Sequence, residues 1–198
     1  MTVTNGYCTL GELRAQISWP SSDTTKDTAL ESIIEATSRF IDRYCHRRFY
    51  ADSANATRYY TSTNTSTLYL NDDIVSIGTL GTDNDGDRTF ENTWATTDYD
   101  LLPLNAAADS KPYTHITVAP QGDYSFPVQA KGISIYGKFG LACPEDIKEA
   151  CLLMSGRLFK RKDAPFGVAG TNQFGTLQVI SNIDPDVEIL LNPWRRLV

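Results

Sequence analysis

A chain of 198 residues, with 41% hydrophobic and 21% charged residues, is long enough to bury one substantial core. It has no apolar run of the roughly 18 residues that a membrane span needs. Its formal charge of −6 argues against a general nucleic-acid-binding protein, because such proteins are usually basic. The N-terminal stretch lacks the basic start and apolar centre of a secretory signal, so we expect a chain made in a cytoplasm.

The first predicted element is a short helix within residues 9–17, TLGELRAQI. Thr9 and Glu12 have the spacing of a capping box, in which each side chain bonds the other residue's backbone N–H. Trp19-Pro20 follows, and a residue before proline avoids helical geometry. The helix is therefore expected to end before Trp19.

A longer helix is predicted around residues 30–44. Its apolar side chains recur at steps of three and four and predict one buried stripe, made of Leu30, Ile33, Ile34, Thr37, Phe40, Ile41 and Tyr44. Four bases are expected on its solvated face and C-terminal turn, where they suit the helix dipole: Arg39, Arg43, Arg47 and Arg48. We interpret them as helix surface rather than as a dedicated DNA-binding surface.

Residues 57–140 are rich in Thr, Tyr, Val and Ile, with turn residues between the runs, which predicts the strands of an antiparallel β unit. Within it Asp83, Asp85 and Asp87 alternate as calcium ligands do. The EF-hand pattern fails, however, because Arg88 and Trp94 stand where it needs glycine and glutamate. We expect a polar hairpin tip and no metal, with the three aspartates as weak metal candidates.

Helix is predicted again from Pro144, which suits a first helical position, to the basic end formed by Lys160, Arg161 and Lys162. A glycine-containing loop is expected over 163–175. A short last helix follows, with Asp184 as its cap and Pro185 first.

These elements predict an α+β fold, in which a small helical bundle carries an inserted antiparallel β unit. The bundle would contain the opening helix pair and two C-terminal helices. The expected domains are the N-terminal helices of the bundle (1–56), the β unit (57–140), and the C-terminal helices with a docking tail (141–198).

Chemical motifs are sparse. The four cysteines are scattered without a CxxC pair, so we expect free, partly buried thiols rather than a zinc site. The two histidines, His46 and His115, are not paired with a nucleophile by any recognisable pattern, and no Walker loop, GxSxG or HExxH occurs. We expect no enzyme and no cofactor.

Three stretches resemble the head-tail connector family (adaptor or head-completion proteins) of long-tailed bacteriophages and gene-transfer particles. They are the helix pair TLGELRAQI and LESIIEATSRFIDRYCHRRFY, the strand block RYYTSTNTSTLYLNDDIVSIGTL, and the strand-turn-helix ISIYGKFGLACPEDIKEACLLMSGRLFKRKD. The resemblance lies in the order and texture of the elements and covers most of the chain. The long acidic insertion departs from the small helical members, so its role is not carried over.

The resemblance implies a structural virion protein of the neck, assembled in the host bacterial cytoplasm. Identical subunits would form a ring, usually a dodecamer, that lies below the portal, extends the DNA channel and docks the next neck or tail protein. The implied partners are further copies, the portal protein, a downstream neck, stopper or tail protein, and passing genomic DNA in transient, non-specific contact, with no membrane.

The resemblance also implies roles for two groups of residues. The C-terminal segment would dock on the portal through Trp194, Arg195, Arg196, Leu197 and Val198, the alternative being that Trp194 closes the core. A subunit interface or channel rim would use Arg39, Arg43, Arg47, Arg48, Lys160, Arg161 and Lys162. Other functions stay open: another virion component such as a tail terminator or decoration protein, a calcium-binding β module, or an enzyme.

Overall fold

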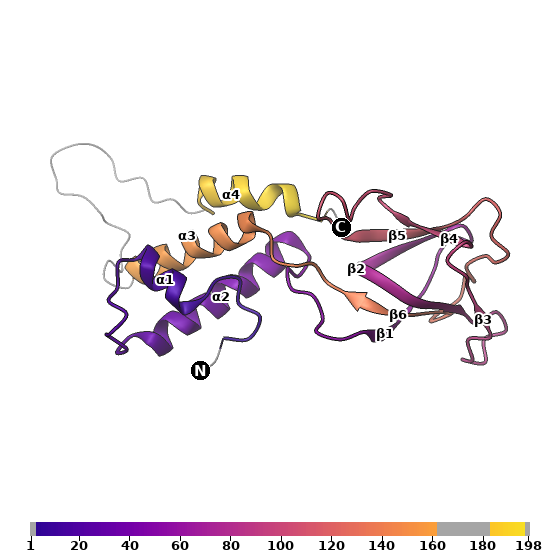
Figure 1. The fold of residues 1–198 in the computed structure, drawn as a ribbon, viewed down its shortest axis with the longest axis horizontal. Coiled ribbons are helices and arrows are strands. Elements are labelled where there is room, and N and C mark those ends of the chain that lie inside the picture. The colour runs from indigo at the N-terminus through magenta and orange to yellow at the C-terminus, as the bar shows by residue number, and fades with distance from the viewer. Residues whose placement is uncertain (1–2, 162–182, 197–198) are drawn as a thin grey trace. The chain divides into compact units, whose positions relative to one another are not determined.

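The computed structural model describes residues 3–161 and 183–196, which form two compact units (Figure 1). The helical unit consists of Met1–Phe49 and Cys143–Val198, and the β unit of Tyr50–Ala142. Across residues 3–161 and 183–196, four α-helices and an antiparallel sheet confirm the predicted α+β fold class. Within the described ranges, no helix has both the length and the apolar character that a membrane crossing needs.

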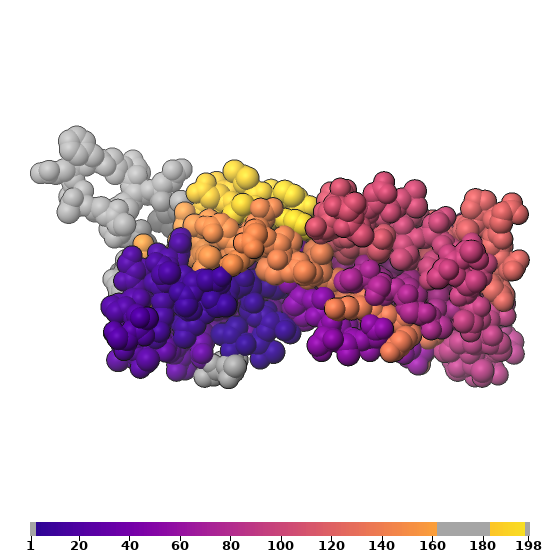
Figure 2. Space-filling model, in the orientation of Figure 1, coloured from indigo at the N-terminus to yellow at the C-terminus, as the bar shows by residue number. Residues whose placement is uncertain are grey.

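The helical unit is built from α1 (Leu10–Gln16), α2 (Asp27–Cys45), α3 (Glu145–Arg161) and α4 (Pro185–Leu191), followed by the short 3-10 helix η1 (Asn192–Trp194). Helix α3 contacts each of the other three α-helices. The space-filling view shows α4, in yellow, lying along α3, in orange (Figure 2). Residues from both ends of the sequence therefore share one core.

Local capping signals place the starts of two helices. The predicted capping box of α1 is confirmed: the Thr9 N–H donates to Glu12 Oε2 at 2.8 Å, and the Glu12 N–H donates to Thr9 Oγ1 at 3.2 Å. The Asp184 carboxylate caps α4 by accepting the Asp186 N–H at 2.9 Å. Asp184 also pairs with Arg157 of α3, which fastens α4 to its neighbour.

The buried face of α2 differs from the predicted stripe. Leu30, Ile34, Thr37 and Ile41 are buried as expected, but Ser38 and Cys45 join them. The ring pair Phe40 and Tyr44 and the side chain of Ile33 are only half-buried. The N-terminal segment and α3 cover the side of α2 that carries Ser38, which displaces the buried face toward that residue.

The β unit contains β1 (Ala56–Tyr60), β2 (Thr67–Thr82), β3 (Asn92–Thr93), β4 (Tyr99–Leu102), β5 (Tyr113–Val118) and β6 (Ile133–Phe139). The main path through the sheet runs β1-β6-β2-β5-β4, with every pair antiparallel, and β3 pairs with the end of β2. Strand β2 is long, and its register shifts against both neighbours let it pair first with β5 and then with β6.

The core of the β unit is rich in aromatic residues. The rings of Trp94 and Phe126 stack with centroids 4.7 Å apart, and Tyr99 and Tyr124 lie against the same indole. The Trp94 Nε1–H donates to Thr82 Oγ1 at 3.1 Å, so the only polar group of the buried indole has a partner. Aliphatic side chains complete this core: Leu68, Ile74, Leu80, Ile116, Ile133 and Ile135.

Candidate functional site

The segment after α4 is fastened to the helical unit by its tryptophan. Trp194 is half-buried, and its ring lies edge-on to Phe49 with centroids 6.1 Å apart. The Trp194 Nε1–H donates to Asp146 Oδ2 at 3.2 Å. Phe49 is fully buried and also meets the Tyr7 ring edge-on at 5.7 Å. Trp194 thus packs at the edge of the helical core, and its docking role stays a prediction.

The two arginines that follow Trp194 differ in exposure. Arg195 is exposed, and its guanidinium carbon lies 5.3 Å from the centre of the Tyr44 ring, within the range of a cation–π contact. Arg196 is half-buried, and its backbone N–H donates to the Cys45 carbonyl at 2.9 Å. The chain therefore passes along the end of α2. The remaining residues of the predicted docking segment, Leu197 and Val198, lie outside the described residues.

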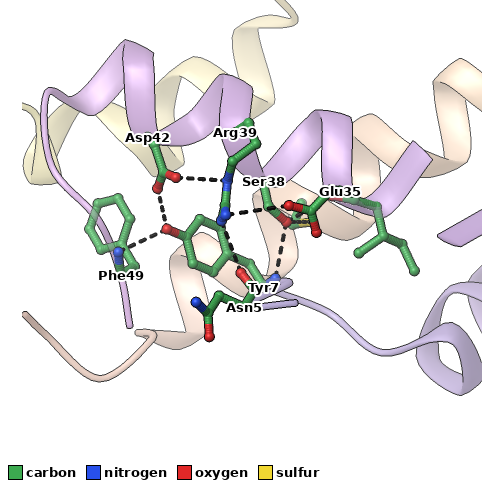
Figure 3. A network of polar contacts seen from close by, with 9 residues as sticks. Asn5, Tyr7, Glu35, Ser38, Arg39, Asp42 and Phe49 are labelled. Carbon is green, nitrogen blue, oxygen red and sulfur yellow. Dashed lines mark hydrogen bonds and ion pairs between the residues drawn. The ribbon is translucent and has the colours of Figure 1, made fainter. Parts of the chain in front are cut away.

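Arg39, predicted on a solvated face, is half-buried and braces the N-terminal segment against α2 (Figure 3). Its Nε lies 2.9 Å from Asp42 Oδ2, and its Nη1 lies 3.4 Å from Glu35 Oε1. Its Nη2 donates to the Asn5 carbonyl at 3.0 Å, and the guanidinium lies over the Tyr7 ring. These contacts make Arg39 a brace, although 31% of its side chain is exposed, so it lies on the surface side of α2 but is not a freely solvated base.

The Tyr7 side chain is the centre of the same network (Figure 3). Its hydroxyl donates to Asp42 and accepts the Phe49 N–H at 2.9 Å, while its own backbone N–H donates to Ser38 Oγ at 3.1 Å. Burial, together with the bond to Asp42, raises the pKa of the Tyr7 hydroxyl, which therefore stays a proton donor. This site was not predictable from the sequence, because Tyr7 lies outside every periodic segment.

The Asp42 carboxyl has a pKa above its usual value. Burial is the largest cause, and it outweighs the Tyr7 hydroxyl and the Arg39 guanidinium, both of which favour the charged form. A half-buried carboxylate of this kind depends on its two partners. If either partner were removed, the Asp42 carboxylate would be left partly buried with less compensation for its charge, which destabilises the fold.

The other three arginines of the predicted cluster lie at or beyond the end of α2. Arg43 is exposed, whereas Arg47 and Arg48 are half-buried. Arg47 and Arg48 follow His46, which ends the helix in the left-handed conformation with φ of 52°. Arg43 is therefore the most accessible of the four arginines predicted on and just after α2.

The basic end of α3 is exposed at Lys160 and Arg161, and Lys162 lies outside the described residues. This end lies beside the turn that precedes α2, because Phe159 meets Trp19 edge-on at 5.8 Å. The start of α3 lies at the other end of α2, where Asp146 bonds Trp194. Helices α2 and α3 are thus antiparallel, and the structure separates the two predicted basic groups instead of joining them.

The three aspartates proposed as weak metal candidates lie in the connection between β2 and β3. Their carboxylates approach one another together with that of Glu91, with all four ligand oxygens within 4.8 Å of each other. The alternation of acids in the sequence ends at Asp87, so it gave no reason to include Glu91. The role of the cluster in binding a metal stays a prediction.

Asp83 organises this acidic connection from its buried end. Its Oδ1 accepts the Gly86 N–H at 2.7 Å and its Oδ2 accepts the Arg88 N–H at 3.0 Å. Burial raises the pKa of Asp83, but these backbone donors bring it below its usual value. The expected turn at Asp85-Gly86 uses the positive φ of 86° at Gly86, and Arg88 also adopts a positive φ of 76°.

The two histidines lie in different units. His46 is exposed at the C-terminal cap of α2. His115 lies in β5, where its ring stacks on Tyr69 with centroids 5.5 Å apart and Nδ1 is 3.1 Å from Thr114 Oγ1. The two rings belong to different units, and their contacts are those of a helix end and of a strand surface.

Comparison with solved structures finds this fold in gene transfer agent (GTA) particles. One similar chain, from the neck of the empty GTA particle computed with C6 symmetry, has a TM-score of 0.58 and 15% identity, over 100% of this chain and 94% of that one. Another, from the neck of the native GTA particle computed with C12 symmetry, has a TM-score of 0.55 and 15% identity, over 100% and 93%. A third, from the virion of the native GTA particle, has a TM-score of 0.53 and 14% identity, over 100% and 94%.

The sequence matches no protein-family model and no curated protein. At identities of 14–15%, the structural comparisons establish a common fold and nothing finer. The chain therefore shares, over its whole length, the fold of chains found in GTA particles, including two from their necks.

Proposed function

We propose that this chain is a structural component of the neck of a phage or GTA-type virion, and more specifically a head-tail adaptor. Its copies form a ring below the portal, extend the DNA channel and dock the next neck or tail protein. The observation that carries the proposal is the fold likeness to GTA neck chains, which extends over all of this chain at a TM-score of 0.58. The sequence resemblance, which rests on the order of elements, supports the same class.

Ring formation needs two different surfaces on each copy, because a heterologous contact closes into a ring when its rotation allows. The exposed side chains supply opposite charges for such a contact. The helical unit presents Arg43, Lys160 and Arg161, and the β unit presents Asp85, Asp87 and Glu91. Single exposed ion pairs contribute about 0–1 kcal/mol, so their role would be to orient neighbours rather than to hold them. The C12 symmetry of one neck supports a dodecamer.

Portal docking is assigned to the segment Trp194–Val198. Trp194 fixes the base of this segment on Phe49, and the exposed Arg195 guanidinium would exchange its contact with the Tyr44 ring for a carboxylate or carbonyl of a partner. Arg196, Leu197 and Val198 complete the proposed docking peptide. This arrangement lets one tryptophan pack the core while the residues after it serve the partner.

Contact with passing DNA, if the ring lines the channel, is sequence-independent and weak in this proposal. A chain of net charge −6 gives DNA little attraction as a whole, and local contacts through exposed bases weaken steeply with salt. Assembly takes place in the host cytoplasm before the particle is complete. The proposed role needs no catalysis and no cofactor.

The test is the mass of the purified chain over a range of concentrations, alone and with portal rings, with negative-stain images of any large species. Closed rings of six or twelve copies, alone or on the portal, are the expected result. A chain that stays monomeric and also ignores portal rings would overturn the adaptor proposal.

The docking segment is tested in the same assay. A chain that ends after Trp194 keeps the Phe49 contact but lacks Arg195, and it is expected to lose portal binding. Lys111→Ala, which removes an exposed base from the β unit, is the matched control and should bind normally. Undiminished portal binding by the shortened chain would contradict the docking role.

A further inference from the structure

Two buried thiols meet in the core of the helical unit. Cys8 lies in the segment before α1 and Cys151 lies in the middle of α3, 143 residues later in the sequence. Their Sγ atoms are 3.4 Å apart, in direct contact, and both side chains are buried. The sequence predicts only scattered free thiols, because no spacing rule connects residues so far apart.

The surroundings fix both sulfurs in place. Ser38 Oγ of α2 lies 3.7 Å from Cys151 Sγ, and Ser155 Oγ lies 3.9 Å from it. The Ser38 hydroxyl donates to the Ile34 carbonyl at 2.8 Å and accepts the Tyr7 N–H at 3.1 Å, so it is held by backbone on both sides. The two thiols thus lie where the N-terminal segment, α2 and α3 come together.

We propose that Cys8 and Cys151 are a site of oxidative modification, at which a low-molecular-weight disulfide converts the two thiols into one intramolecular disulfide. The sulfurs need to approach from 3.4 Å to about 2.05 Å, a movement smaller than the width of an atom. This site is independent of the neck proposal, since it needs only the helical unit.

The reaction is an exchange in two steps. The thiolate of one cysteine attacks a sulfur of oxidised glutathione, a mixed disulfide forms, and one glutathione leaves as its thiolate. The second cysteine then loses its proton and attacks the protein sulfur of the mixed disulfide, which releases the second glutathione. Two protein thiols are oxidised, one glutathione disulfide is reduced to two glutathione thiols, and each glutathione takes up one of the two protons.

Access to the buried pair requires the N-terminal segment to open. Three hydrogen bonds tie that segment to α2: the Tyr7 hydroxyl to Asp42, the Tyr7 N–H to Ser38, and Arg39 to the Asn5 carbonyl. Local opening that breaks them exposes Cys8, and closing returns the two sulfurs to contact. The hydrogen bond between the two sulfurs raises the pKa of the Cys8 thiol and lowers that of the Cys151 thiol, so Cys151 is the thiol of the pair that loses its proton more readily.

The other cysteines provide controls. Cys45 is buried elsewhere in the helical unit, against the Leu191 carbonyl, and Cys143 is exposed. Cys143 is therefore the residue expected to form mixed disulfides with glutathione and nothing more. A cross-link specific to Cys8 and Cys151 is distinguishable from general thiol oxidation.

The experiment treats the full chain, freed of reductant, with oxidised glutathione in mildly alkaline buffer, and then alkylates the remaining thiols after denaturation. We expect Cys8 and Cys151 to escape alkylation, and a peptide map without reductant to join the two peptides that contain them. We expect the melting temperature of the helical unit to rise by roughly 10 °C, because the cross-link closes a very long loop, and added reductant should reverse the shift.

Single Cys→Ser variants test whether Cys8 and Cys151 are the two cysteines that form the cross-link. Cys8→Ser and Cys151→Ser should each abolish the cross-link and the reversible shift in melting temperature, while Cys45→Ser should retain both. Three results would overturn the proposal: four alkylated cysteines after oxidation, glutathione adducts on Cys8 or Cys151 without a cross-link, or a cross-link that joins a different pair.

Discussion

The helical unit and the β unit draw their cores from different parts of the sequence. The β unit takes its whole core from one continuous stretch, Tyr50–Ala142. The helical unit takes its core from both sides of that stretch, and long-range contacts close it, as where Tyr7 and Trp194 both meet Phe49. A continuous unit can fold from its own sequence, whereas a discontinuous one depends on contacts that no local pattern specifies.

The largest expected effect is a loss of stability in the β unit when its core is truncated. Phe126→Ala removes a fully buried ring that stacks on Trp94, so we expect the free energy of unfolding of the β unit to fall by about 4 kcal/mol. Urea unfolding followed by the fluorescence of Trp94 measures it, in a background where Trp19 and Trp194 of the helical unit are replaced by Phe, while helical circular dichroism reports on the other unit. Val128→Ala, at a side chain 59% exposed, is the control and should change little. Equal loss of both signals at one urea concentration would contradict separate units.

The next effect falls on the discontinuous unit. Tyr7→Phe leaves the Phe49 N–H and the Asp42 carboxylate without the hydroxyl, so we expect a loss of about 2 kcal/mol in the free energy of unfolding of the helical unit. Tyr44→Phe also removes a hydroxyl, one that bonds Asn192 near the surface, and should cost about 0.5 kcal/mol. Equal costs for the two variants would show that the buried network does not close the helical unit.

A smaller effect depends on pH. The bond to Lys148 and the Thr9 N–H lower the pKa of Glu12 to about 2. Because the folded-state pKa lies below the unfolded value of about 4.3, Glu12 stabilises the fold above that pH, and this stability is lost as the pH falls toward 2. Glu12 and Lys148 are partly exposed, so we expect about 1 kcal/mol.

The pH effect is measured as the free energy of unfolding between pH 6 and roughly pH 1.5, a range that spans both pKa values. Glu12→Gln should be less stable than the parent at pH 6 and equal to it at the acid end. Glu149→Gln, at an exposed acid on α3, is the matched control. A parent and a Glu12→Gln variant that lose stability in parallel would refute the role of this pair in joining α1 to α3.

The smallest expected effect concerns the acidic connection of the β unit. We expect millimolar calcium, compared with chelator, to leave the melting temperature of the β unit unchanged, because backbone N–H groups already occupy both oxygens of Asp83. Thermal melting followed by near-ultraviolet circular dichroism checks this. A large upward shift would favour the calcium-binding β module over the adaptor.

The features that were predictable from the sequence are those that depend on neighbours in the chain. The Thr9–Glu12 box and the Asp184-Pro185 start are local signals, and both helices begin where these signals place them. The antiparallel β unit followed from composition, but the register shifts of β2 did not, because they depend on two partner strands at once.

The candidate surfaces were harder to predict for the same reason. Arg39 and Arg43 stand one turn apart on α2, yet Arg39 is a brace and Arg43 is exposed. The difference comes from the N-terminal segment, which covers one and not the other, and helix periodicity carries no information about that segment. The contact between Cys8 and Cys151 and the approach of Glu91 to the aspartates are likewise long-range or off-pattern.

Phe49 links the two ends of the chain through a single ring. Its N–H and its ring hold Tyr7, and its ring also receives Trp194. A partner that grips the C-terminal segment and shifts Trp194 would therefore alter how firmly the N-terminal segment is held. Because coupling between two binding events is reciprocal, order at one end of the chain would set affinity at the other. The buried ring of Phe49 would then transmit a change at the last segment of the subunit to the first.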